Sequence, residues 1–173
     1  MEFSLSQSLE ILERTPAVLK TLLDGLPDTW THVNEGDDTW SAYDVVGHLI
    51  HGEKTDWIPR MKTILEFGME RPFEQFDRYA QFQESQGKTL TQLLHDFTRL
   101  RQENLQTLKN TPLDEDALDK KGIHPAFGEV TLRQLLACWT VHDLGHIHQI
   151  SRVMAKQYSS AVGPWIVYLG VLK

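Results

Sequence analysis

Residues 131–156 read TLRQLLACWTVHDLGHIHQISRVMAK and carry an uninterrupted helical pattern. Thr131 followed three residues later by Gln134 is a capping box, which predicts a helix start, and no proline follows it in this stretch. Apolar residues and two histidines recur at steps of three and four residues, the period of one helix face. These residues are Leu132, Leu135, Leu136, Trp139, His142, His146, Ile150 and Val153. We therefore predict a long helix whose buried face includes His142 and His146.

The spacing of His142 and His146 places their imidazoles on one side of this helix, roughly 6 Å apart along its axis. Eight histidines in 173 residues would give about 0.4 such pairs by chance, so the spacing alone is weak evidence of a metal site. A buried imidazole without a partner costs free energy. Either a shared divalent ion or hydrogen bonds between two core histidines would satisfy the pair. His148 lies off this face, and we expect it at the surface.

Composition narrows the class of protein. A length of 173 residues fits one domain, residues 1–173. The formal charge of −7 argues against a nucleic-acid partner, because phosphate contacts need a basic surface. The single cysteine, Cys138, excludes an internal disulfide and suits a reducing compartment. The N-terminus lacks a basic region followed by an apolar one, and no stretch approaches the roughly 18 apolar residues of a membrane span. We expect a cytoplasmic protein without membrane contact.

Three further helical patterns precede the first stretch. One covers residues 6–26, and we expect a break near Pro16 because proline removes a backbone hydrogen bond and clashes with the preceding turn. A second helix begins at Ser41, and a third begins at Thr89 and ends before Pro112. No alternating strand pattern of convincing length is present. The sequence thus predicts an all-α four-helix bundle.

The connections between these helices are expected to be irregular. Residues 68–87 form a long connection with at most short helical turns, and residues 109–129 form a loop in which His124 is exposed. A short closing helix begun by Pro164 is expected to seal one end of the bundle. Aromatic residues step by three along the long connection, and we expect them to pack against the bundle rather than wall a pocket. They are Phe73, Phe76, Tyr79 and Phe82.

His48, on the inner side of the second predicted helix, is the candidate third metal ligand. A structural zinc site usually has four protein ligands, whereas a catalytic site has about three and keeps one position open. Two histidines from one helix and one from another would form the open kind. Further along the second helix, His51, Glu53 and Asp56 are either partners of the ligands or solvent-facing residues, and we expect them to face solvent.

Cys138 lies one helical turn before His142 and so faces the same general region. A thiolate ligand is one interpretation, but cysteine more often behaves as a small buried apolar residue, which is the interpretation we favour. Asp143 follows His142 directly but lies about 100° around the helix, so we do not assign it as a ligand.

The sequence resembles the DinB-like superfamily, including its YfiT-like metal-dependent members. The resemblance is carried by WSAYDVVGHL at residues 40–49, HDLGHIHQ at residues 142–149 and GPW at residues 163–165. It implies a four-helix bundle with up-down-down-up connectivity and a divalent metal, zinc, nickel or iron. The ligands it implies are His48, His142 and His146. Gln149 matches the glutamine that follows the pair in the family, although Ile147 and His148 replace the usual basic residue and glycine before it.

The resemblance also implies an activity. Relatives of this kind include enzymes that use low-molecular-weight thiols such as bacillithiol or mycothiol. We therefore expect either hydrolysis or thiol transfer on a small-molecule substrate, in a protein that dimerises through a helix face. Three neutral imidazoles would leave room on the metal for water or a thiolate. The alternative is a non-catalytic helical bundle in which the metal is structural or senses an ion, or in which no metal binds.

Overall fold

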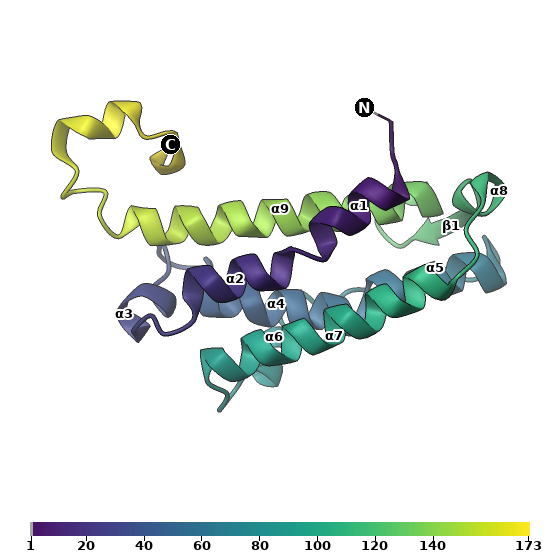
Figure 1. The fold of residues 1–173 in the computed structure, drawn as a ribbon, viewed down its shortest axis with the longest axis horizontal. Helices are drawn as coiled ribbons and strands as arrows, with labels where there is room; N and C mark the ends of the chain where they lie inside the picture. Colours follow the sequence, from purple (N-terminus) through teal and green to yellow (C-terminus); the bar gives the residue numbers. More distant parts are fainter. Residues whose placement is uncertain (1) are drawn as a thin grey trace.

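Four helical segments lie side by side in the computed structural model, which describes residues 2–173 (Figure 1). The first segment is α1 (Leu5–Leu12) with α2 (Thr15–Leu23), and the second is α4 (Ala42–Thr55) with α5 (Trp57–Phe67). The third and fourth are α7 (Leu90–Asn110) and α9 (Leu132–Lys156). Shorter elements lie between and after them: α3 (Asp28–Thr31), α6 (Ala80–Glu84), α8 (Glu115–Leu118), β1 (Lys121–His124), β2 (Gly128–Thr131), η1 (Gly163–Tyr168) and η2 (Gly170–Leu172). The predicted all-α four-helix bundle is confirmed.

The helical segments follow the up-down-down-up order. Lys109 lies 2.6 Å from Glu13, and Thr91 donates to Asp24 over 2.9 Å, so the first segment runs antiparallel to α7. Figure 1 shows that α9 runs in the direction of the first segment, whereas α4 with α5 runs in the direction of α7. Because the second and third segments are parallel, residues 68–89 must return the chain along the bundle.

The helix boundaries follow the predicted local signals. Ser41, Thr89 and Thr131 each form a complete capping box, in which the hydroxyl accepts from the N3 backbone amide while the N3 side chain accepts from the cap backbone. The expected break near Pro16 is present, because α1 ends four residues before it and the proline lies in the first turn of α2. Among residues 2–173, no helix is long and apolar enough to cross a membrane.

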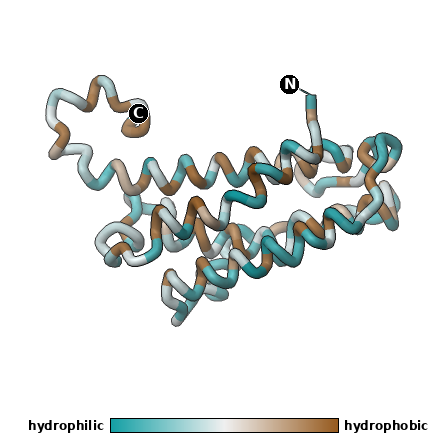
Figure 2. The backbone as a smooth tube through the Cα atoms, viewed as in Figure 1, coloured by the Kyte–Doolittle hydropathy of each residue, from teal (hydrophilic) through white to brown (hydrophobic). Residues whose placement is uncertain are grey.

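The core consists of two apolar clusters that meet at one polar side chain. In one cluster, the rings of Trp57 and Trp139 stack with their centroids 5.6 Å apart. The other cluster surrounds Phe97. The guanidinium of Arg101 lies between the clusters, 4.9 Å from the Phe97 ring and 5.2 Å from the Trp139 ring. Figure 2 shows the corresponding alternation of hydrophobic and hydrophilic residues along the helices.

Arg101 is 1% exposed and uses all five of its N–H groups. It donates two hydrogen bonds to Asp143 of α9, at 2.6 and 2.9 Å, and two to Glu53 of α4, at 2.8 and 3.0 Å. The fifth reaches the carbonyl oxygen of Leu12 at the end of α1. One side chain of α7 therefore joins all four helical segments. Glu53 is 2% exposed, so the prediction that it faces solvent is wrong.

Two predictions for the connections are also wrong. Residues 109–129 include the helix α8 and strand β1, which pairs antiparallel with β2. Each strand has only four residues, KGIH and GEVT, and neither alternates apolar with polar residues. The segment after α9 forms two 3-10 helices with no buried residue, so it does not seal the bundle. The segment leaves the end of α9 and bends back, so that η2 lies against α9.

Replacing Arg101 by methionine is expected to lower the free energy of unfolding by about 3–5 kcal/mol, because Glu53 and Asp143 would remain buried without their cation. Urea denaturation followed by circular dichroism measures the change. Arg99→Met is the matched control, since Arg99 is half-exposed on the same helix and forms a solvent-exposed pair with Glu103. Equal stability losses in the two variants would contradict the role assigned to Arg101.

Candidate metal centre

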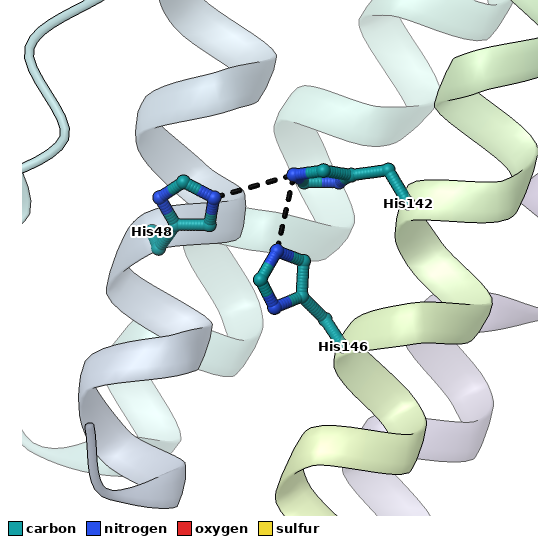
Figure 3. A group of neighbouring side chains, drawn as sticks. All are labelled: His48, His142 and His146. Carbon is teal, nitrogen blue, oxygen red and sulfur yellow. Dashed lines mark hydrogen bonds between the residues drawn. The ribbon is translucent and has the colours of Figure 1, made fainter. Parts of the chain in front are cut away.

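His48 of α4 and His142 and His146 of α9 point their rings at one another across the gap between the two helices (Figure 3). Nε2 of His142 lies 3.2 Å from Nε2 of His48 and 3.1 Å from Nε2 of His146. One ring nitrogen from each residue lies within 4.8 Å of the other two. The structure thus brings together the three histidines that the sequence analysis selected.

The three ring nitrogens cannot all satisfy one another. Nδ1 of His146 donates to the side-chain oxygen of Gln149 over 2.8 Å. Nε2 of the neutral His146 ring is therefore unprotonated and carries a free lone pair. Nε2 of His142 contacts two neighbouring nitrogens but can donate only one proton. In one of the two close contacts, therefore, two lone pairs or two N–H groups face each other. A cation bound to the lone pairs would remove this repulsion.

The arrangement fits a divalent metal. Nitrogens bonded to one tetrahedral zinc ion lie about 3.3 Å apart, close to the 3.2 and 3.1 Å that separate Nε2 of His142 from Nε2 of His48 and of His146. The hydrogen bond from His146 to Gln149 fixes the tautomer that leaves Nε2 free to bind a metal, which is the usual role of such an outer partner. Gln149 therefore supports the site despite the changed residues before it.

Burial keeps the cluster neutral. Desolvation, with a smaller contribution from His146, lowers the pKa of His48 to about 3 and that of His142 to about 2. Desolvation also lowers the pKa of His146. Near neutral pH the rings are uncharged, which is the form that binds metal.

Aromatic rings surround the imidazoles. The Trp40 ring lies 4.8 Å from His48 and stacks at 6.5 Å on His146, and the Phe76 ring meets His48 edge-on at 5.5 Å. The Trp57 ring lies 5.0 Å from His142. These rings exclude water from much of the imidazole surface, which accounts for the lowered pKa values.

The histidines line a pocket of about 930 Å³. Three of the four aromatic residues of the long connection line it too, so the prediction that they pack against the bundle is correct only for the fourth, Phe73, which is 5% exposed. The connection passes beside the site because it must return along the bundle. The three pocket residues are Phe76, Tyr79 and Phe82.

The residues near the predicted ligands differ from expectation. His51 is 6% exposed and lies 2.8 Å from Glu84, so it does not face solvent. Asp56 is mostly buried, lines the pocket and pairs with Arg60 over 2.6 Å. Burial raises the pKa of Asp56 to about 6. Cys138 is exposed and lies outside the histidine cluster, so neither of its two predicted roles is confirmed.

Most of the charged residues of the pocket wall were not predicted from the sequence. Arg152 of α9 pairs through two hydrogen bonds with Glu35, which precedes α4. Arg78, from the long connection, also lines the pocket, and His124 is half-buried at its edge. Glu35 and Arg78 lie in segments without helical periodicity, so no pattern in the sequence marked them. His148 is exposed, as predicted.

The fold and the site define a class of protein, namely a four-helix bundle with a three-histidine cluster between its second and fourth segments. The chain belongs to the DinB superfamily, whose family model matches residues 11–150. This confirms the resemblance seen in the sequence.

Among solved structures, the chain is similar to YfiT from Bacillus subtilis, with a TM-score of 0.74 and 21% identity. The match covers 94% of each chain. That protein is described as a probable metal-dependent hydrolase with an unusual four-helix bundle topology. At this identity the likeness establishes the fold. No curated protein matches the chain in sequence.

The lowered pKa values predict a pH dependence for the metal-free protein. The unfolded chain binds protons below about pH 6.5, whereas His142 in the folded chain does not until about pH 2. The contribution of His142 to the free energy of unfolding is therefore fully present above about pH 6.5. It falls as the pH decreases, by up to about 1.4 kcal/mol per pH unit. His142→Gln should remove that part of the slope. Urea denaturation in EDTA between pH 6.5 and 5.0 measures it.

The difference between His142→Gln and wild type isolates this group, because the buried carboxyls that titrate nearby, Asp56 among them, are common to both proteins. His95→Gln, an exposed position on α7, serves as the matched control and should leave the slope unchanged. An identical slope in His142→Gln and wild type would show that His142 is not held neutral by the fold.

Proposed function

We propose that this protein is a divalent-metal-dependent hydrolase of small molecules, with His48, His142 and His146 as the metal ligands. The observation that carries the proposal is the convergence of three Nε2 atoms at the wall of a pocket of about 930 Å³. Three protein ligands beside an accessible pocket are the arrangement of catalytic sites, whereas structural sites are closed by a fourth ligand. The metal is zinc, nickel or iron, since these ions accept imidazole ligands.

When bound, an ion of this kind would act as a Lewis acid and would lower the pKa of its bound water to about 7. The chain supplies the remaining functions. Gln149 holds His146 in the tautomer that presents Nε2. Trp40, Phe76 and Trp57 surround the imidazoles and keep them neutral. Asp56, whose pKa is raised to about 6, is placed in the pocket wall to accept or return a proton near neutral pH.

The pocket wall suits a small molecule with an apolar part and an anionic group. Tyr79 and Phe82 offer aromatic surface at 65% and 43% exposure. Arg152 and Arg60 are already paired with carboxylates of the same wall. Arg78 makes no ion pair with any described residue, so we assign it to an anionic group of the substrate.

Thiol transfer is the second candidate reaction, since an open position on the same site would equally hold a small thiolate. Assaying hydrolysis of small esters and amides beside transfer from a small thiol to an electrophile distinguishes the two. A non-catalytic bundle with a structural or sensing metal would bind the ion but fail both assays.

Elemental analysis of protein purified without a histidine tag tests the proposed ligands. Wild type is expected to carry close to one zinc, nickel or iron ion per chain. His48→Ala and His142→Ala should each lose it, because removing one of three histidines leaves only two protein ligands. His95→Ala, which removes an exposed histidine of α7, should retain it. Wild-type protein that neither carries a metal nor takes one up on dialysis would refute the proposal.

A further inference from the structure

The β1–β2 hairpin lies at the end of the bundle where α9 begins (Figure 1). Strand β2 leads directly into the capping box of α9 at Thr131. The amide of Phe73 donates to the carbonyl oxygen of Ile123 over 2.9 Å, which joins the hairpin to the start of the long connection. Gly122 lies so close to α5 that a Cβ added there would come within 2.7 Å of Ile64. The hairpin is therefore fixed to three neighbouring segments of the chain.

The tip of the hairpin carries two rings, those of His124 and Phe127, into the wall of the histidine pocket. The two rings stack with their centroids 4.3 Å apart and an angle of 16° between their planes. The buried ring of Phe73 meets the His124 ring edge-on at 6.1 Å. Phe127 itself is 77% exposed. The hairpin thus holds an uncovered aromatic surface beside the pocket.

Backbone amides of the turn fix the tautomer of His124. Its Nδ1 accepts hydrogen bonds from the amides of Ala126 and Phe127, at 3.1 and 3.3 Å. A neutral imidazole has one acceptor nitrogen and one N–H group, so Nε2 of His124 carries the proton. No residue of the described chain accepts a hydrogen bond from this Nε2. The tip therefore offers one free N–H donor.

The surroundings of the hairpin keep this donor neutral. Burial, with a smaller contribution from the positive charge of Arg60, lowers the pKa of His124. The guanidinium of Arg60 lies 5.3 Å from the Phe73 ring and is already paired with Asp56 over 2.6 Å. The tip thus presents an aromatic face and a neutral N–H group rather than a free charge, which suits an uncharged ligand group.

The hairpin does not need Phe127 for its own packing. Val130 packs against the core cluster of Trp139, and Phe73 belongs to this cluster, whereas Phe127 belongs to neither core cluster. Its stacked partner nevertheless holds the ring in place. A ring that is already ordered in the free protein loses little conformational freedom when a ligand binds. Phe127 is therefore better explained by a ligand than by stability.

We propose that His124 and Phe127 form a specificity site for a planar, unsaturated group that carries a hydrogen-bond acceptor. The Phe127 ring stacks on the face of this group, and Nε2 of His124 donates to its acceptor atom. We call the two residues the hairpin site. That its ligand is the substrate rests on the proposed function, in which this group belongs to the part of the molecule that is not hydrolysed. Binding of the group itself does not require the metal.

Titration with benzamide in EDTA, followed by proton–nitrogen correlation NMR, tests the hairpin site. Benzamide is planar and uncharged and has a carbonyl acceptor, whereas cyclohexanecarboxamide carries the same amide on a ring that is not planar. A molecule of this size is expected to bind with a Kd of about 10 mM. Benzamide should bind about 5-fold more tightly than cyclohexanecarboxamide, because only the planar ring stacks. It should also shift the amide signals of Ala126 and Phe127.

Two variants separate the two contacts. Phe127→Leu keeps an apolar side chain but removes the ring, so it should raise the Kd of benzamide about 5-fold and abolish the preference for the planar amide. His124→Asn keeps an acceptor at the position of Nδ1, which preserves the turn, but removes the Nε2 donor. It should raise the Kd of both amides about 5-fold.

Trp165→Leu is the matched control for Phe127→Leu, because Trp165 is 70% exposed but lies outside the pocket. It should leave both Kd values unchanged, and circular dichroism spectra identical to wild type would show that the variants fold. No binding of benzamide to wild type would overturn the hairpin site, as would binding that Tyr79→Leu weakens and Phe127→Leu does not. If the predicted binding occurs in a protein that takes up no metal, the hairpin site stands and the proposed hydrolase falls.

Discussion

The buried cation of Arg101 is the constraint on which the rest of the fold depends. A charge in an apolar interior is tolerated only when every donor finds an acceptor, and Arg101 meets this condition by drawing on three other segments. Two carboxylates face one guanidinium, and burial raises the pKa of Glu53 while the carboxylates raise that of Arg101. The register that the structure shows is one in which these three buried charges are paired with one another.

The register imposed by Arg101 is also what assembles the histidine cluster. Glu53 lies on the same helix as His48, and Asp143 is the residue after His142. By binding both Glu53 and Asp143, the guanidinium fixes the axial position of α4 relative to α9 so that the imidazoles of the two helices meet. Trp139 completes the link, since its indole donates to Glu53 over 3.2 Å. The polar network thus positions the site without taking part in its chemistry.

The sequence was sufficient for the bundle and the three histidines, because helical periodicity, capping boxes and the family resemblance all depend on local pattern. It was insufficient wherever a residue's environment depends on a distant segment. Glu53 appeared solvent-facing because its partner lies 48 residues away, although a polar residue at the Arg101 position of an otherwise leucine-rich stripe was a visible signal. The hairpin and the wall of the pocket were not predicted, because short strands and aperiodic connections carry no repeating pattern. The exposure of the C-terminal segment depends on tertiary packing, so the sequence did not show that this segment fails to seal the bundle.

The most direct test of the three-histidine metal site is an anomalous difference map from crystals of the zinc-loaded protein, collected on both sides of the zinc absorption edge. The three-histidine site predicts one strong peak at about 2.0–2.1 Å from Nε2 of His48, His142 and His146, with no other protein atom bound to the ion. A peak bonded to Cys138 or to His51, or located away from this cluster, would contradict it.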